Sequence, residues 1–317
     1  MQAKDCVLGI DTSNYRTSVA MIRRGDEVLC DLRKQLTVKQ GERGLRQSHA
    51  LFQHIEALPS LIGEAVKGKN KAVAAVAVST RPRPAEGSYM PVFRAGESFS
   101  EALAKAFDVP VFKFSHQEGH IEAIKNFSSF KDKGRFLCYH LSGGTCELLK
   151  ISENSIEIIG GTKDISFGQV IDRAGVNLGL SFPSGEQFDV ISQKTGGNFD
   201  FLKEINIDGL RVNLSGIDTK IARIIENGLD SSERDLLIKD ILNKISNVLI
   251  TLTEKAAIST KIKDVLFTGG VSTSKFIYEK LSAHFNGTDI NIEFGDQRLS
   301  SDNAVGVALL GGKELWR

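Results

Sequence analysis

A short segment at residues 115–120 combines residue types and spacing that could hold a metal ion. His116 and His120 lie four residues apart, so a helix that begins after the preceding strand would place both imidazoles on one face. Two imidazoles so spaced can bind one divalent ion, although they could also be two partly exposed histidines at a helix start. A zinc protease needs a glutamate directly after its first histidine, whereas Glu118 stands two positions later, so we discount peptidase activity.

A centre with two histidines needs at least one further ligand, and the sequence offers a carboxylate near the C-terminus. Asp302 directly precedes an apolar segment that is predicted to be a helix. An aspartate at this position could equally be an ordinary N-cap. His140, beside a Ser-Gly-Gly loop, is either another ligand or a half-buried strand residue. The residues alone therefore leave the roles of Asp302 and His140 open.

Polar loops rich in glycine, serine and threonine follow apolar strands at three points of the chain. They span residues 11–14, 142–145 and 268–272. Glycine and serine let backbone N–H groups approach an anion closely, so the loops could hold the phosphates of a nucleotide between two lobes. The first two could instead be tight hairpin turns. A Walker A loop is excluded, because Lys275 follows no second glycine at the required spacing.

The elements that must position these residues occur twice in the same order. Triple strands are predicted at residues 7–10, 18–22 and 28–32, and again at 136–141, 148–151 and 156–159. Each triple is followed by helical periodicity and by further strands that alternate with helices, which is typical of a largely parallel sheet covered by helices. Two copies of one α/β unit are implied, with lobes at residues 1–130 and 131–317 and the last helix packing back at the lobe interface.

Apolar spacing predicts the elements after each triple. One helical face contains Leu51, Ile55, Leu58 and Ile62, and a longer one contains Leu237, Ile241, Ile245, Val248 and Leu252. Buried strands are predicted at residues 72–78, 109–114 and 264–268, and another helix at residues 274–285.

Composition limits the function classes. The 317 residues include 40 Lys and Arg against 39 Asp and Glu, a formal net charge of +1. A protein that binds nucleic acid by itself carries a clear basic excess, so any RNA contact here must use a local patch. The alternative is that a scattered set of basic residues forms only a solvated surface. The candidates are Arg43, Arg46, Arg81, Arg83, Arg94, Lys131, Lys133 and Arg135.

The cysteines and the apolar runs indicate in which cellular compartment the protein works. The four cysteines form no CxxC pair, which favours reduced thiols over disulfides or a thiolate zinc site. The first residues lack the apolar core and cleavage site of a signal peptide, and no apolar run is long enough to span a membrane. We expect a cytoplasmic protein with no membrane partner.

Taken in order, these motifs resemble those of the tRNA threonylcarbamoyladenosine transferases (TsaD, formerly called glycoproteases), over nearly the whole chain. The matching segments are 9–13 (GIDTS, family GIETS), 116–120 (HQEGH, family HxEGH), 141–144 (LSGG, family VSGG), 168–172 (GQVID, family GEAFD), 183–189 (PSG and Asp189, family PGG and Asp), 215–216 (SG, family FSG), 269–272 (GGVS, family GGVA or GGVS) and 302–304 (Asp-Asn-Ala). Seven or more motifs in the correct order are far more specific than any single one.

The resemblance implies a duplicated actin-like (ribonuclease H-like, ASKHA) α/β fold, with two lobes around a nucleotide cleft. It also implies one divalent ion, iron or zinc, bound by His116, His120 and Asp302, with His140 where archaeal relatives place a ligating tyrosine. The implied ligand is ATP, AMP or an acyl-adenylate. The implied nucleotide-binding residues are Leu141, Ser142, Gly143, Gly144, Thr145, Asp172, Gly185, Asp189, Gly270 and Ser274, and the implied N-lobe loop is Asp11, Thr12 and Ser13.

The chain departs from the family at several positions. The GPG-containing loop after an N-lobe strand is replaced by residues 79–84, and the stretch at 85–94 is unlike the family's small-residue run. The acidic pair after GIETS is replaced by Asn14, Tyr15 and Arg16, the His of SGGH by Thr145, the Glu of GEAFD by Gln169 and the Asn after GGV by Ser274. These departures suggest a divergent paralogue whose acceptor side differs.

The resemblance implies a reaction and leaves alternatives open. A metal would polarise the carbonyl of threonylcarbamoyl-adenylate, an adenosine amine of tRNA would attack, and AMP would leave without any side-chain nucleophile. One alternative is an ATPase or carbamoyltransferase with a different acceptor, since the arginines within residues 81–94 could recognise a small anion. Another is a non-catalytic scaffold. A TsaB-like partner or a homodimer would use the N-lobe.

Overall fold

The computed structural model describes residues 4–13, 15–38, 45–152, 155–197, 200–300 and 302–317. Two residues named above, Asn14 and Arg43, lie outside the described residues. The described residues form two compact units. Unit 1 comprises residues 4–38, 45–128 and 298–317, and unit 2 comprises residues 129–297.

Unit 1 is built on a five-stranded sheet in the order β3–β2–β1–β4–β5. Its strands are β1 Cys6–Asp11, β2 Arg16–Arg23, β3 Glu27–Gln35, β4 Val73–Arg81 and β5 Val111–Ser115. Its helices are α1 Gln47–Val66, α2 Phe93–Phe107, α3 His116–Asn126 and α10 Val305–Leu315, with a 3-10 turn at Asn70–Ala72. The first three strands are antiparallel, and β4 and β5 run parallel to β1.

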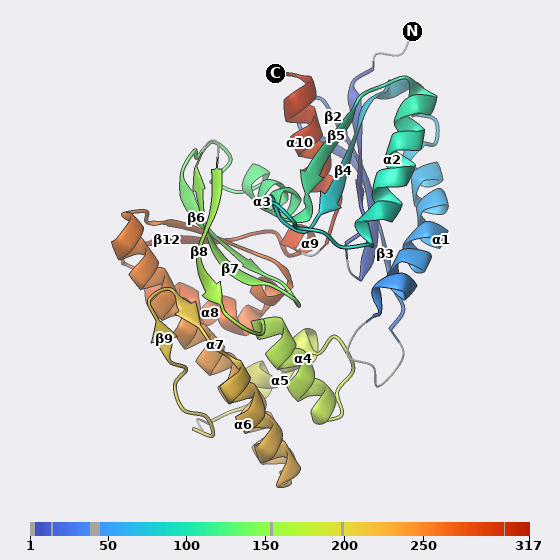
Figure 1. The fold of residues 1–317 in the computed structure, drawn as a ribbon. Helices are drawn as coiled ribbons and strands as arrows, with labels where there is room; N and C mark the ends of the chain where they lie inside the picture. The colour runs from blue at the N-terminus through green and yellow to red at the C-terminus, as the bar shows by residue number, and fades with distance from the viewer. Residues whose placement is uncertain (1–3, 14, 39–44, 153–154, 198–199, 301) are drawn as a thin grey trace. The chain divides into compact units, whose positions relative to one another are not determined.

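The central strand β1 is buried on both faces, and its residues alternate between two cores. Cys6, Leu8 and Ile10 pack with the apolar faces of α1 and α2, and Val7 packs with α10 on the other side (Figure 1). Gly9 lets α10 approach, because a Cβ there would lie 2.5 Å from the carbonyl oxygen at the helix N-cap. The apolar face of α10 thus explains why residues 298–317 pack with unit 1.

Helix α1 shows where the sequence pattern was incomplete. Leu58 and Ile62 are buried, whereas Ile55, which the apolar spacing placed on the same helical face, is 44% exposed. His54 is buried in its stead, because the buried stripe runs at spacing four through residues 50, 54, 58 and 62.

Unit 2 contains a seven-stranded sheet in the order β12–β11–β6–β7–β8–β10–β9. Its strands are β6 Phe136–Leu141, β7 Cys146–Ser152, β8 Ser155–Thr162, β9 Ile207–Asp208, β10 Arg211–Val212, β11 Asp264–Thr268 and β12 Asn291–Phe294. Its helices are α4 Phe167–Asn177, α5 Gly185–Lys194, α6 Ser215–Glu226, α7 Ser231–Thr260 and α8 Lys275–Phe285, with a 3-10 turn at Gly270–Thr273. The short α9 Gln297–Ser300 follows.

The duplicated fold predicted from the repeated triple strands is confirmed by the two sheets. The order β8–β7–β6–β11–β12 repeats the order β3–β2–β1–β4–β5, with the same antiparallel and parallel pairings. The long helix expected in the second half is α7, whose five predicted apolar positions are all buried. No helix among the described residues is long and apolar enough to cross a membrane.

Candidate metal centre

The helix that carries the two histidines begins directly where β5 ends. Ser115 is its N-cap: the Ser115 Oγ accepts a hydrogen bond from the Glu118 N–H at 3.2 Å, and Glu118 Oε2 accepts one from the Ser115 N–H at 2.6 Å. This capping box fixes the first turn. His116 and His120 therefore lie one turn apart on the same face of α3, with their rings edge to face.

Three ligand atoms converge at this turn. The Nε2 atoms of His116 and His120 are 2.9 Å apart, and Asp302 Oδ1 lies 3.5 Å from the first and 3.4 Å from the second. One ligand atom from each of the three residues lies within 4.8 Å of the others. Two imidazoles and a carboxylate suit zinc, iron or manganese, so the residues fit the divalent ion that the sequence analysis expected.

Asp302 does not cap the C-terminal helix. The carboxamide oxygen of Asn303 accepts hydrogen bonds from the backbone N–H groups of Val305 and Gly306, at 3.1 and 3.3 Å. The Asp302 carboxylate instead forms the histidine contacts described above. The geometry therefore favours the ligand interpretation of Asp302 over the N-cap interpretation.

Asp11, at the end of β1, orients the first histidine. Its Oδ2 lies 2.7 Å from His116 Nδ1 and also accepts a hydrogen bond from the Ser79 hydroxyl at 2.9 Å. A proton on Nδ1 that bonds to Asp11 leaves Nε2 as the ligand atom, a common arrangement around metal-bound histidines. Sequence reasoning placed Asp11 in the N-lobe loop but missed this contact, since the two residues lie 105 positions apart.

The next two residues of the N-lobe loop fix it in place. The Ser13 N–H donates to Asp11 Oδ1 at 2.7 Å. The Thr12 hydroxyl donates to the Val92 carbonyl at 3.0 Å and accepts from the Gly96 N–H at 3.1 Å, which joins the loop to the first turn of α2. Thr12 and Ser13 therefore hold the carboxylate that orients His116.

The charges of the cluster shift its pKa values strongly. Burial alone would lower the pKa of His116, but the charge and hydrogen bond of Asp11, followed by those of Asp302, raise it to about 10. Burial and the nearby His116 lower the pKa of His120. Burial alone would raise the pKa of either carboxyl, but the histidines hold the pKa of Asp11 and Asp302 below the ordinary value. This cluster contains several acceptor atoms and a protonated imidazole. A divalent ion can bind to such a cluster in place of the imidazolium proton.

His54 is a buried histidine near the centre that sequence reasoning missed. Its Nδ1 lies 2.9 Å from the Thr17 hydroxyl, and the residue is fully buried. Burial lowers the pKa of His54 to about 4, against the opposing charges of Asp11 and Asp302. Its spacing from Ala50 and Leu58 on α1 is the signal that could have placed it in the buried stripe.

In unit 2 the predicted phosphate loop is the turn between β6 and β7. The Ser142 N–H donates to the Thr145 carbonyl at 2.8 Å, and the Thr145 N–H donates to the Ser142 hydroxyl at 3.0 Å. A Cβ built on Gly143 or Gly144 would meet nothing within 4 Å, whereas one on Gly168 would lie 2.6 Å from the Gly143 Cα. The protein itself therefore packs against one side of the loop and leaves space beside the Cα atoms of its two glycines.

Two of the predicted nucleotide residues form one contact with each other. Asp189 accepts hydrogen bonds from the Ser274 hydroxyl at 2.6 Å and from the backbone N–H groups of Lys275 and Phe276 at 3.1 and 2.9 Å. Ser274 is also the N-cap of α8. This pair holds the start of α8, and its contact with a nucleotide stays a prediction.

The other predicted nucleotide residues lie near the ends of strands and helices of unit 2. Asp172 accepts the Ser184 N–H at 2.8 Å, and burial raises the pKa of its carboxyl. Gly185 and Gly270, like the loop glycines, have open space where a Cβ would be. Leu141 ends β6 and is buried.

His140 is the residue before Leu141 in β6. It is 4% exposed and lies between Glu147 of β7 and Thr268 of β11 in the strand register. The residue belongs to unit 2, and its role as a fourth metal ligand stays a prediction.

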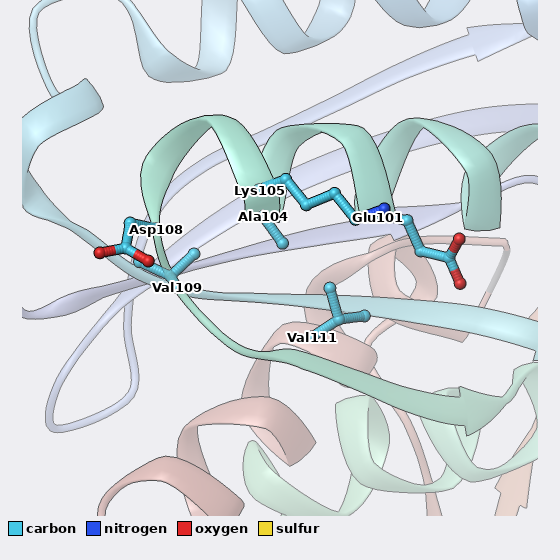
Figure 2. A pocket seen from close by; sticks show the side chains of 6 residues that line it. All are labelled: Glu101, Ala104, Lys105, Asp108, Val109 and Val111. Carbon is cyan, nitrogen blue, oxygen red and sulfur yellow. The ribbon is translucent and has the colours of Figure 1, made fainter.

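A cavity of about 500 Å³ lies at the other end of β5 from the histidines. Figure 2 shows it beneath α2, with the side chains of Val109 and Val111 on its floor and the carboxylates of Glu101 and Asp108 at opposite ends. None of the predicted site residues lines it, so the cavity is separate from the candidate metal centre.

Comparison with known proteins agrees with the motifs. The profile of the family described as tRNA N6-adenosine threonylcarbamoyltransferase (TsaD) matches residues 31–309. A tRNA N6-adenosine threonylcarbamoyltransferase of Streptococcus pneumoniae serotype 2 is 27% identical over 312 residues, which cover 95% of this chain and 90% of that protein. Its counterpart in strain JJA is equally similar, at 27% over 312 residues.

Solved structures support the fold. Component A of the (R)-2-hydroxyglutaryl-CoA dehydratase of Acidaminococcus fermentans is similar at a TM-score of 0.61 and 14% identity, with 99% of this chain and 100% of that one covered. A ROK family glucokinase of Streptomyces griseus is similar at a TM-score of 0.54 and 11% identity, with 96% and 98% covered. These likenesses show the two-lobed actin-like fold. Because the family profile spans most of its length, the chain belongs to the tRNA N6-adenosine threonylcarbamoyltransferase family.

Proposed function

We propose that this protein transfers a threonylcarbamoyl group from threonylcarbamoyl-adenylate to the N6 amine of an adenosine in tRNA. The single observation that carries the proposal is the convergence of His116, His120 and Asp302, in a chain of this family. A divalent ion held by these three residues would act as a Lewis acid on the carbamoyl carbonyl. Iron and zinc both suit the ligand set.

The residues of the chain supply orientation and charge. Asp11 fixes the tautomer of His116 and so presents its Nε2 as a ligand. In unit 2, we expect the backbone N–H groups of Gly143 and Gly144 to bind the phosphate of the adenylate and to stabilise the leaving anion. The amine nitrogen forms the new bond to the carbamoyl carbon, the carbon–oxygen bond to phosphate breaks, AMP leaves with the electron pair, and the amine loses one proton.

A partner through unit 1 belongs to the same proposal. Helix α1 exposes two large apolar side chains, Phe52 at 61% and Ile55 at 44%. Such residues on one helix suit a protein contact, and we propose that a TsaB-like protein or a second copy of the chain binds there. Since the substrates are tRNA and an adenylate, we place the reaction in the cytoplasm.

The test uses metal-loaded protein, threonylcarbamoyl-adenylate and tRNA, with and without a TsaB-like partner. We expect metal-dependent formation of threonylcarbamoyladenosine in tRNA, detected by mass spectrometry, together with one AMP for each modified nucleoside. Asp289→Asn, which changes an exposed carboxylate of unit 2 that is not among the predicted site residues, is a control that should keep full activity. Nucleotide turnover without tRNA modification would support the alternative of a different acceptor, and an inactive protein without bound metal would support a scaffold.

A further inference from the structure

Arg81 lies beside the candidate metal centre, although it is far from the ligands in sequence. It is the last residue of β4, and the parallel register places it opposite Ser115, the residue before His116. The backbone that follows is also joined to α3, because the Gln117 N–H donates to the Pro82 carbonyl at 3.0 Å. The carboxyl ends of neighbouring parallel strands thus bring an arginine to the first turn of the ligand helix.

The guanidinium of Arg81 is weakly engaged by the protein. Its nearest charged partner is Glu118 Oε2 at 4.0 Å, and 37% of its side chain is exposed. The same Glu118 oxygen already accepts the Ser115 N–H at 2.6 Å. Among the described residues Arg81 makes no hydrogen bond from its side chain, so most of its five N–H donors remain available to a ligand. A partly exposed ion pair at this distance contributes little by itself.

Other basic residues of unit 1 differ from Arg81 in their contacts. Arg94 pairs with Glu97 at 2.5 Å, and Lys113 pairs with Glu97 and Glu101 at 2.9 and 2.7 Å. These pairs form a charged row along α2 and β5. Arg83 is exposed two residues beyond Arg81. Arg81, by contrast, lies opposite Ser115 at the start of the helix that carries the two histidines.

The charge balance of the metal centre indicates which kind of ligand Arg81 could bind. With a divalent ion bound, the carboxylates of Asp11 and Asp302 already balance the charge of the metal. An acyl group that carries its own carboxylate would add an uncompensated negative charge unless another cation meets it. A guanidinium matches a carboxylate geometrically with two parallel hydrogen bonds.

We propose that Arg81 is a specificity residue that binds the carboxylate of the transferred acyl group. The inference rests on the proposed function, because it takes the threonyl part of the threonylcarbamoyl group as the ligand. An acyl-adenylate without that carboxylate would gain nothing from Arg81. The arginine would thus select N-carbamoyl amino acids over uncharged carbamoyl groups at the same centre.

The experiment measures binding, which does not depend on the acceptor. Two probes are titrated into metal-loaded protein by calorimetry: a stable sulfamoyl analogue of threonylcarbamoyl-adenylate, and the same molecule with a carboxamide in place of the carboxylate. We expect the wild-type protein to prefer the carboxylate probe about 10- to 100-fold, the usual size of a charge-assisted hydrogen-bonded pair. Arg81→Ala should lose this preference, and Arg81→Lys should keep part of it.

Two controls separate recognition from structure. Arg83→Ala, on the same segment, should bind both probes as the wild type does, and the metal content of Arg81→Ala should equal that of the wild type. If Arg81→Ala weakens both probes equally, Arg81 only supports α3 and the proposal is overturned. An unchanged preference in Arg81→Ala, or none in the wild type, would overturn it as well. Charge discrimination without tRNA modification would leave the proposal standing and instead count against tRNA as the acceptor.

Discussion

In unit 1 the candidate centre is made of side chains that contact one another, whereas in unit 2 the predicted phosphate loop offers backbone beside open space. His116, for example, is held between Asp11 and the other two ligands. Gly143 and Gly144 have no protein atom where a Cβ would stand. The comparison teaches that two units with the same strand order can present different chemistry: one brings imidazole and carboxylate side chains together, and the other presents an open glycine turn.

The largest expected effect comes from breaking the side-chain site. Asp302→Asn keeps the shape of the side chain but removes the negative charge, so we expect bound metal to be lost and transfer to fall about 1000-fold, equivalent to about 4 kcal/mol of transition-state stabilisation. Metal analysis by mass spectrometry and the tRNA assay check this. Stoichiometric metal in Asp302→Asn would remove the basis for a centre at this position.

The second effect is a pH dependence of stability that His54 gives to unit 1. Because burial lowers the pKa of folded His54 to about 4 from an ordinary 6.5, its neutral form contributes stability above pH 6.5 that is lost as the pH falls towards 4. The loss amounts to about 3 kcal/mol. Denaturant unfolding at pH 7 and pH 4 measures it.

The control for His54 is His54→Gln, which keeps a polar group near Thr17 but cannot titrate. The variant should be less stable than the wild type at pH 7, and the difference should shrink by about 3 kcal/mol at pH 4. A constant difference at both pH values would show that His54 does not titrate in this window.

A third prediction contrasts Gly143 of the loop in unit 2 with Gly168 of α4, which packs against that loop. Gly168→Ala should destabilise the protein by about 1–3 kcal/mol, because its Cβ would lie 2.6 Å from the Gly143 Cα. Gly143→Ala should change stability by less than about 0.5 kcal/mol, yet weaken binding of the sulfamoyl analogue. Thermal unfolding and calorimetry test both. Full affinity in Gly143→Ala would mean that no ligand approaches this glycine.

The smallest expected effect concerns the Asp189–Ser274 pair. Ser274→Ala removes the N-cap of α8 and the hydrogen bond to Asp189, so it should cost about 1 kcal/mol of unfolding free energy. Ser274→Asn restores a good N-cap and should be nearly neutral. If both variants lose nucleotide affinity without losing stability, then Ser274 serves the ligand and not the helix.

The sequence was sufficient for the repeated strand order, since each apolar run between polar turns could be recognised locally. It also gave His116 and His120, because their spacing of four places them on one helical face wherever the helix lies. Asp302 required the resemblance, because an aspartate before a helix is ordinary. The structure favours the ligand interpretation, because Asn303 and not Asp302 accepts the first N–H groups of α10.

Only the tertiary structure determined the contacts between residues that are far apart in the chain. Asp11 meets His116, and Arg81 meets the first turn of α3, because β1, β4 and β5 are parallel neighbours whose carboxyl ends lie at one edge of the sheet. His54 replaced Ile55 in the buried stripe because the packing of α1 on the sheet selects the face that is buried. Spacing along a chain defines each helix and strand, but the sheet order determines which of them share an edge.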